Sequence, residues 1–171
     1  KSRSRGLGDV YKRQKMIILD GKKTSADIKD EIASEVKSIT LSGDRPPHLA
    51  ALIVGNDGAS LTYVGSKVKA CEKVGFDSTL LSLPESISEQ ELLSKVYELN
   101  NDDKIDGYIV QLPLPKHIDT QKVLMAVDPK KDVDGFHPTN FGKMALKLPT
   151  FISATPNGIM ELLKRYKVST E

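Results

Sequence analysis

The chain has 171 residues, of which 39% are hydrophobic and one is cysteine, and its formal net charge is +2. This length and apolar content are enough for one ordinary globular core. A single cysteine excludes an intrachain disulfide, no Cys/His cluster indicates zinc, and no apolar run is long enough to span a membrane. We therefore expect a cytoplasmic protein without a structural metal and without a membrane partner.

Residues 1–15 differ from the rest of the chain in charge. They hold six Lys/Arg residues and one Asp, whereas the remaining 19 basic and 22 acidic residues leave the rest at −3. The segment has neither the apolar run of a signal peptide nor helical periodicity, and SRGLGDVYKRQ resembles a translated sequencing adapter. We interpret 1–15 as a non-native leader before a native start at Met16, which removes the argument for a nucleic-acid partner. The alternative is a basic arm that contacts nucleic acid.

From Met16 onward, strand and helix patterns alternate. The continuous apolar run 49–54 is typical of a strand covered on both faces, and apolar residues recur at helical spacing between the strands. The predicted elements are, in order, a strand at 16–19, a helix at 24–39, a strand at 49–54, a helix from a cap at Ser60 to Gly75, a strand at 76–83, a helix from a capping box at Ser88, and a strand at 107–112.

This βαβαβ order predicts the fold class. It indicates an α/β, three-layer domain in which a mostly parallel sheet has helices packed on its faces. Ligands of such sheets bind beyond the carboxyl ends of the strands, and Gln111 lies at one of these ends.

The last third of the chain has a different pattern. A short helix is predicted at 119–127, followed by a polar loop and an amphipathic helix at 159–166, with Thr155 as its cap before Pro156. Because this helix is still amphipathic where the sequence stops, we expect a chain truncated before a further domain.

Tyr63 and Lys67 form the first candidate site. They are four residues apart, so on a helix they lie on one face. An aromatic ring beside an amine suits a flat, polar heterocycle, because the ring stacks on it while the amine meets its reacting edge. The alternative is a surface Tyr against the stem of a solvated Lys.

Gln111 is the second candidate. An amide at the end of a buried strand must find partners, or it costs about 1–3 kcal/mol in desolvation. It can accept a hydrogen bond from an amine and donate one to a ligand carbonyl at the same time, and Pro113 and Pro115 stiffen the backbone that follows. The alternative is that Gln111 only satisfies neighbouring backbone groups.

The third candidate is the DVDG turn. Asp132 and Asp134 resemble a calcium loop, but Lys130 and Phe141 occupy positions at which that loop needs carboxylates. We therefore expect no metal here. One carboxylate of the turn can instead pair with the amino group and ring N–H of a guanidine-like heterocycle. The alternative is an Asx turn with a solvated side chain.

Four stretches together resemble a known family in order and spacing. They are YVGSKVKACEKVG (63–75), DGYIVQLPLP (106–115), PKKDVDGFHPTNFGKM (129–144) and ATPNGIMELLKRY (154–166). The family is the bifunctional methylenetetrahydrofolate dehydrogenase/methenyltetrahydrofolate cyclohydrolase, and the likeness runs from Met16 to about Tyr166. One departure is Ser153-Ala154-Thr155-Pro156, where the family often has Pro-Cys-Thr-Pro.

The resemblance implies a domain organisation and roles for the site residues. Residues 16–152 would form a folate-binding catalytic domain, and 153–171 an inter-domain helix before a Rossmann-type NAD(P)-binding domain. Lys67 would be the catalytic residue, Tyr63 would stack on the folate, Gln111 would hold Lys67, and Asp134 would bind the pterin. The substrate-binding residues implied in this way are Tyr63, Lys67, Val110, Gln111, Leu112, Pro113 and Asp134.

The resemblance also implies a reaction in one-carbon folate metabolism. A homodimer would oxidise 5,10-methylenetetrahydrofolate with NADP or NAD and hydrolyse the product to 10-formyltetrahydrofolate. Hydride transfer depends on positioning, whereas hydrolysis needs proton movement, which a partly desolvated Lys67 can supply. Because the cofactor domain would begin just after Glu171, we expect the chain alone to lack dehydrogenase activity.

Two other functions remain open from the sequence. One is a folate-binding or interaction module without a cofactor domain. The other is the substrate domain of a different α/β dehydrogenase that acts on an amino acid or a shikimate-like acid. The latter needs basic residues for a carboxylate rather than Asp134 for a pterin.

Overall fold

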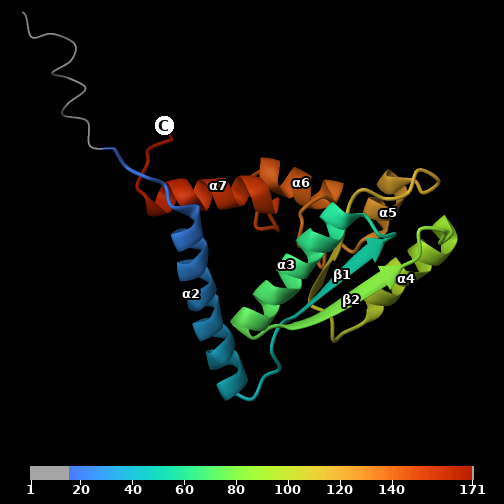
Figure 1. Ribbon diagram of the computed structural model, residues 1–171, viewed down its shortest axis with the longest axis horizontal. Helices are drawn as coiled ribbons and strands as arrows, with labels where there is room; N and C mark the ends of the chain where they lie inside the picture. The colour runs from blue at the N-terminus through green and yellow to red at the C-terminus, as the bar shows by residue number, and fades with distance from the viewer. Residues whose placement is uncertain (1–15, 171) are drawn as a thin grey trace, which may run out of the picture.

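The computed structural model describes residues 16–170, so the leader predicted at 1–15 lies outside the described residues. In chain order its elements are α2 (Gly21–Leu41), β1 (His48–Val54), α3 (Gly58–Val74), β2 (Asp77–Leu83), α4 (Glu89–Asn101), β3 (Gly107–Val110), α5 (Thr120–Ala126), α6 (Pro138–Ala145) and α7 (Ala154–Arg165) (Figure 1).

The described strands form one parallel sheet. Its order is β2-β1-β3, with β1 in the centre, and Leu52 of β1 is in register with Leu81 of β2 and Val110 of β3. The predicted parallel α/β sheet is therefore confirmed.

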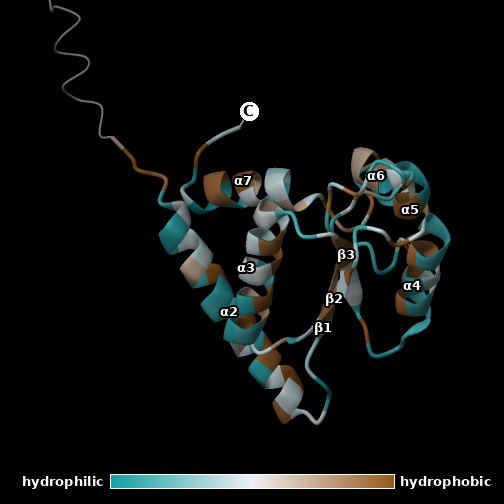
Figure 2. Ribbon diagram, turned by 45° about the vertical axis from the view of Figure 1, so that its right-hand side comes forward, coloured by the Kyte–Doolittle hydropathy of each residue, from teal (hydrophilic) through white to brown (hydrophobic). Residues whose placement is uncertain are grey.

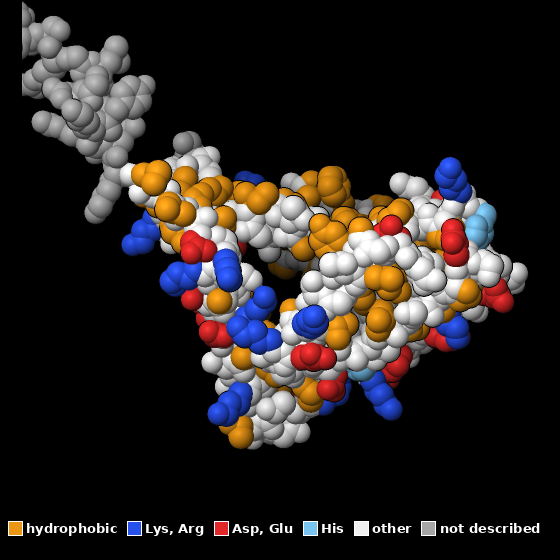
Figure 3. Space-filling view, in the orientation of Figure 1, with side chains coloured by type: hydrophobic (Ala, Val, Ile, Leu, Met, Phe, Trp, Pro, Cys, Tyr) orange, Lys and Arg blue, Asp and Glu red, His pale blue; other side chains and the backbone are white. Residues whose placement is uncertain are grey.

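The strand predicted at 16–19 is wrong. Residues 16–19 have no regular secondary structure, and the side chains of Met16, Ile17 and Ile18 are 64–83% exposed. The segment precedes α2, away from the sheet, so no strand edge is available to satisfy its backbone groups (Figure 1). Apolar side chains gather there and along the neighbouring α7 (Figure 3).

Both faces of β1 are buried, which gives the domain three layers (Figure 2). On one face, alternate residues of β1 join a cluster with helices α4 and α5, made of Ala50, Leu52, Val54, Leu92, Val96, Leu99 and Val123 among others. On the other face, Ala51 and Ile53 pack with Val64 of α3. Alternation along one strand thus supplies both cores, and α2 packs on α3 rather than on the sheet.

Two helix ends, at Gly75 and Ser88, agree with the sequence, whereas the start of α3 differs. Gly75 ends α3 in the left-handed conformation at φ 83°, and Ser88 forms the predicted capping box with Glu91. The predicted cap of α3 at Ser60 is wrong, because the Asp57 carboxylate accepts the Ser60 N–H at 2.8 Å. The helix starts earlier than expected because Asp57, also a favoured capping residue, already accepts an N–H of the first turn.

The segment after β3 contains a helix that the sequence did not predict. Helix α6 begins at Pro138, where a polar loop was expected, and the His137 ring accepts the Thr139 N–H at 3.1 Å as its cap. The helix predicted at 119–127 is present as α5. Helix α7 begins at Ala154, so the predicted cap at Thr155 is wrong and Thr155 lies inside the first turn.

The chain segment 131–133 runs beside β3. The Tyr108 N–H donates to the Lys131 carbonyl at 2.9 Å, and Tyr108 and Asp132 form an isolated parallel bridge. A Cβ atom on Gly107 would lie 2.3 Å from Cγ1 of Val133. Only glycine at position 107 therefore permits this approach.

We expect Gly107→Ala to lower the free energy of unfolding by roughly 1–3 kcal/mol, because the new methyl group overpacks Val133. Urea denaturation measures the change. Adding Val133→Ala to this variant should cost less than the sum of the two single changes.

Gly142→Ala is the matched control. A Cβ at Gly142 of α6 meets nothing within 4 Å, so this variant should be neutral or more stable by up to about 1 kcal/mol. Equal destabilisation by the two alanines would refute a steric role for Gly107.

Candidate functional site

A cavity of about 340 Å³ lies beyond the carboxyl end of β3. Its walls come from α3, the residues after β3, the turn before α6 and the start of α7. The lining residues are Tyr63, Lys67, Val110, Gln111, Leu112, Asp134, Phe136, Ala154 and Thr155. All the site residues predicted from the sequence are thus brought together except Pro113.

Pro113 lies in a neighbouring hollow. It lines that space with residues after β1, including Gly55 and Asp57, and with Leu114 and Pro115. The structure therefore separates Pro113 from the cavity, although Leu112 immediately before it is a lining residue.

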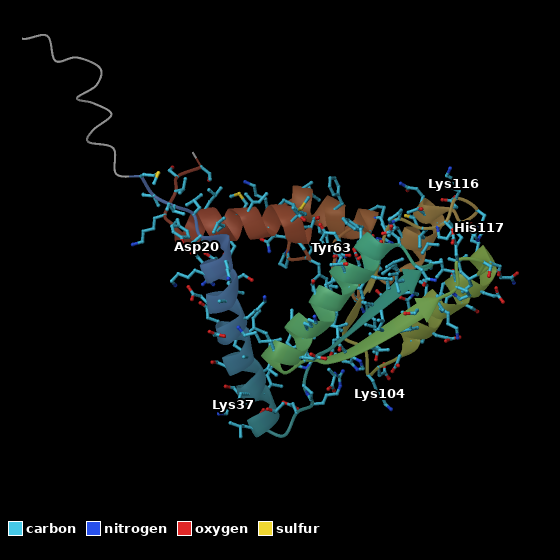
Figure 4. The ribbon with its side chains drawn as sticks, viewed as in Figure 1. Asp20, Lys37, Tyr63, Lys104, Lys116 and His117 are labelled. Atoms are coloured by element: carbon cyan, nitrogen blue, oxygen red, sulfur yellow. The ribbon has the colours of Figure 1, made fainter. Side chains whose placement is uncertain are left out.

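The first turns of α3 carry Tyr63 and Lys67. Because α3 follows β1 directly, these turns stand at the carboxyl edge of the sheet, where Tyr63 lies near α6 and α7 (Figure 4). Tyr63 is 68% exposed, whereas Lys67 is half-buried. The exposed ring of Tyr63 and the sheltered amine of Lys67 are therefore available to the same bound molecule.

The start of α3 is fixed by its cap, Asp57. Hydrogen bonds from the Ser60 backbone and hydroxyl hold the pKa of the Asp57 carboxyl below its ordinary value.

Gln111 is fixed by the backbone around it. Its N–H donates to the Leu52 carbonyl at 2.8 Å, which extends the β1–β3 ladder by one residue. Its side-chain Nε2 donates to the Leu112 carbonyl at 2.7 Å. Among the described residues, no hydrogen bond joins Gln111 to Lys67. The amide thus satisfies a neighbouring backbone group, and its Oε1 is the atom that remains to accept from an amine or a ligand.

Asp134 is the acidic group of the cavity. Burial raises the pKa of its carboxyl above the ordinary value, and the positive charge of Lys67 opposes this rise. The nearby Asp132 contributes in the same direction as burial. A donor pair on a bound heterocycle would compensate the buried carboxylate, since charge-assisted hydrogen bonds are the strong ones.

Asp132 has a different role from Asp134. It is 5% exposed, and its carboxylate accepts the Phe136 N–H at 3.2 Å and the His137 N–H at 2.8 Å. The turn predicted as an alternative for the DVDG stretch is therefore organised by Asp132, while Asp134 lines the cavity.

Three lining residues were not identified from the sequence. Phe136 follows the DVDG turn directly, and Ala154 and Thr155 enter the cavity from the first turn of α7. The sequence did not mark them as site residues, because Phe136 and Ala154 are apolar and Thr155 was expected to cap a helix. The position of Phe136 beside a recognised turn was the one available signal.

A larger cavity lies between α2, α3 and α7, with a volume of about 500 Å³. Its walls are mostly apolar, with Ile28, Ile32, Cys71 and Leu162 among them, and Lys67 lies at its border with the site. Its polar side chains are those of Thr24, Ser25, Lys29 and Lys67, and it has no carboxylate or side-chain amide. It therefore lacks the acidic group and the amide that the smaller cavity places beside Lys67.

Within residues 16–170, no three His, Cys, Asp or Glu side chains are grouped as metal ligands. The ring nitrogen Nε2 of His48 contacts Thr79 Oγ1 at 2.8 Å, and that of His117 contacts the Ile87 carbonyl at 2.9 Å. No helix in the same range has the length and hydropathy needed to cross a bilayer.

Comparison with known proteins decides the family. The family model described as tetrahydrofolate dehydrogenase/cyclohydrolase, catalytic domain, matches residues 19–134. The chain belongs to this family. Bifunctional protein FolD of Flavobacterium johnsoniae is 72% identical over 155 residues, which cover 91% of this chain and 52% of that protein. The corresponding protein of Bacteroides thetaiotaomicron is 59% identical, with 91% and 53% covered.

Solved structures of the tetrahydrofolate dehydrogenase/cyclohydrolase family share the fold. The bifunctional FolD enzyme of Campylobacter jejuni is 44% identical, with a TM-score of 0.87 over 90% of this chain and 55% of that chain. The Trypanosoma brucei enzyme, solved with NADP and an inhibitor, is 31% identical, with a TM-score of 0.85 over 91% and 53%. The chain therefore spans about half the length of the relatives it matches.

Asp134 should make stability fall as pH rises. Below its ordinary pKa of 3.8 the carboxyl is protonated in both the folded and the unfolded state. Between 3.8 and the raised pKa of the folded state, the unfolded state ionises first, so the free energy of unfolding decreases. Above the raised pKa the deficit stays constant.

Asp134→Asn should remove this dependence. Urea denaturation of both proteins across a pH series gives the difference, in which the other carboxyl groups cancel. Wild type should lose stability relative to the variant as pH rises through this interval. A difference that stays flat, or that favours wild type at higher pH, would contradict the raised pKa.

Proposed function

We propose that this chain supplies the folate-binding catalytic part of a methylenetetrahydrofolate dehydrogenase/methenyltetrahydrofolate cyclohydrolase of one-carbon metabolism. The observation that carries the proposal is the single cavity that contains Tyr63, Lys67, Gln111 and Asp134. The name of the Campylobacter jejuni protein, which is 44% identical, supports both activities. That of a Bombyx mori protein, which is 40% identical, supports the dehydrogenase activity.

The cavity offers complementary groups to a reduced folate. The Asp134 carboxylate accepts from the amino group and ring N–H of the pterin, and that pairing offsets its burial. The exposed Tyr63 ring stacks on the planar part of the folate. Val110, Gln111 and Leu112 form the wall at the end of β3.

Lys67 is the proposed catalytic residue. In the hydrolysis, water adds to the methenyl carbon, one carbon–nitrogen bond breaks, and the nitrogen that leaves takes up a proton. An amine at the cavity wall can move protons between the water and that nitrogen. The Gln111 Oε1 is the acceptor that would orient the Lys67 amine, although the two are not hydrogen-bonded in this structure.

The turn between β1 and α3 does not have the pattern of a dinucleotide site. The turn after β1, Gly55–Gly58, lacks the third glycine of a pyrophosphate-binding turn. The N-terminus of α3, where a pyrophosphate would bind, is capped by the Asp57 carboxylate. The nicotinamide cofactor is therefore assigned to the additional length that the relatives have.

NADP is the proposed cofactor, with NAD as the alternative, because the Trypanosoma brucei enzyme was solved with NADP. Within this chain, 16–152 is the proposed catalytic domain, and 153–171, which includes α7, leads toward the cofactor domain. The proposed full-length protein is a homodimer and acts in the cytoplasm.

Lys67→Ala should reduce hydrolysis of 5,10-methenyltetrahydrofolate by about 10²–10⁴-fold, because a general acid–base group is lost. Loss of the methenyl absorbance measures the rate, with the uncatalysed hydrolysis subtracted.

Lys69→Ala is the matched control. Lys69 lies on the same helix but is exposed and outside the cavity, so its loss should leave the rate unchanged. A Lys67→Ala protein with the wild-type rate would exclude the catalytic role. Folate binding without hydrolysis in wild type would favour the binding-module alternative.

Tyr63→Ala should weaken folate binding by about tenfold, or ~1.4 kcal/mol, since the stacking surface is removed. Tyr63→Phe keeps the ring and should bind as wild type does. Isothermal titration calorimetry with 5-formyltetrahydrofolate gives both affinities. Equal affinity of the alanine and phenylalanine variants would argue against stacking.

A further inference from the structure

A buried hydrogen-bond network supports the DVDG turn without lining the cavity. It begins at Asp132, whose carboxylate holds the N–H groups of Phe136 and His137. The same carboxylate accepts Nδ2 of Asn140 at 2.9 Å. One buried side chain thus fixes both ends of the segment that contains Asp134.

Asn140 is the centre of this network. It is 2% exposed, and its Nδ2 also donates to the Pro129 carbonyl at 2.8 Å. Its Oδ1 accepts the Thr150 hydroxyl at 2.8 Å. Both ends of the amide are therefore engaged, and they join the turn to residues before it and to the segment that leads into α7.

The segment after Thr150 touches the turn directly. Gly135 has φ +68°, and a Cβ there would lie 3.0 Å from the Phe151 carbonyl oxygen and from the Ser153 nitrogen. This segment leads into Ala154 and Thr155, which line the cavity. The network therefore connects two walls of the site.

We propose that Asp132, Asn140 and Thr150 are positioning residues that set the place of Asp134 in the cavity. None of the three lines the cavity itself. The inference rests on the proposed function only in taking Asp134 as the group that binds the pterin. In this proposal the Thr150 hydroxyl holds Asn140, Asn140 holds Asp132, and Asp132 fixes the turn that places Asp134 in the cavity wall. Thr150 thus affects pterin specificity without contacting the ligand.

Thr150 is the residue at which the proposal can be tested with least risk to folding. Thr150→Val is nearly isosteric and removes only the hydroxyl, which leaves Oδ1 of the buried Asn140 without its donor. Thr150→Ser keeps the hydroxyl. Thr139→Val is the control, because Thr139 is exposed on α6 and its side chain forms no hydrogen bond among the described residues.

The first readout needs no folate. Carbon-13 NMR of the Asp134 carboxyl in the free protein should show its pKa nearer the ordinary value in Thr150→Val, because the loosened turn is more solvated. Thr150→Ser and Thr139→Val should titrate as wild type does. An Asp134 titration unchanged by Thr150→Val would overturn the proposal.

The second readout is the affinity for 5-formyltetrahydrofolate, measured by calorimetry well below the unfolding temperature. Thr150→Val should bind about tenfold more weakly, and Thr150→Ser should restore the affinity. In an Asp134→Ala background, Thr150→Val should cause no further loss. An equal loss in both backgrounds would show a general structural effect and overturn the positioning role.

The two readouts separate the positioning role from the proposed function. A wild-type protein without folate affinity would refute the proposed function, while the NMR titration would still decide whether Thr150 positions Asp134.

Discussion

The parallel pairing of β1 with β3 is the constraint on which the site depends. It places the exits of both strands at one edge, so the first turns of α3 and the residues after β3 face the same space. The hydrogen bond from the Gln111 N–H to the Leu52 carbonyl extends this ladder into the cavity wall. An α/β topology thus converts two distant stretches of sequence into one binding surface.

The site also depends on two aspartates of one turn that have different roles. Asp132 is fully engaged by backbone N–H groups and by Asn140, so its charge is compensated inside the protein. Asp134 is partly desolvated, and the positive charge of Lys67 offsets only part of the cost of burying its carboxylate. A site that keeps one carboxylate satisfied can hold the other ready for a ligand.

Much of the fold followed from the sequence because apolar periodicity and glycine positions report burial directly. The apolar run of β1, the end of α3 at Gly75 and the capping box at Ser88 were each predicted. The strand expected at 16–19 failed because an apolar run becomes a strand only beside a partner edge. Helix α6 was missed because its start depends on a histidine cap and a proline that also suit a loop.

The residues of the candidate site were predicted better than the hydrogen bonds that they form. Spacing on α3 and position at a strand end identified Tyr63, Lys67 and Gln111, which the cavity brings together. The partners of the Gln111 amide could not be predicted from the sequence. Its Nε2 can donate to any nearby carbonyl, here that of Leu112, and its Oε1 can accept from an amine such as that of Lys67. The support from Asn140 and Thr150 depends on long-range packing that no local pattern reports.

The close approach of Val133 to Gly107 has a consequence for how this protein can change over generations. Every single substitution at position 107 introduces a Cβ atom into space that Val133 already fills. A replacement at position 107 therefore costs least after position 133 has become smaller. The strand and the turn that carries Asp134 should then accumulate replacements in a preferred order, with a reduction at 133 before an enlargement at 107.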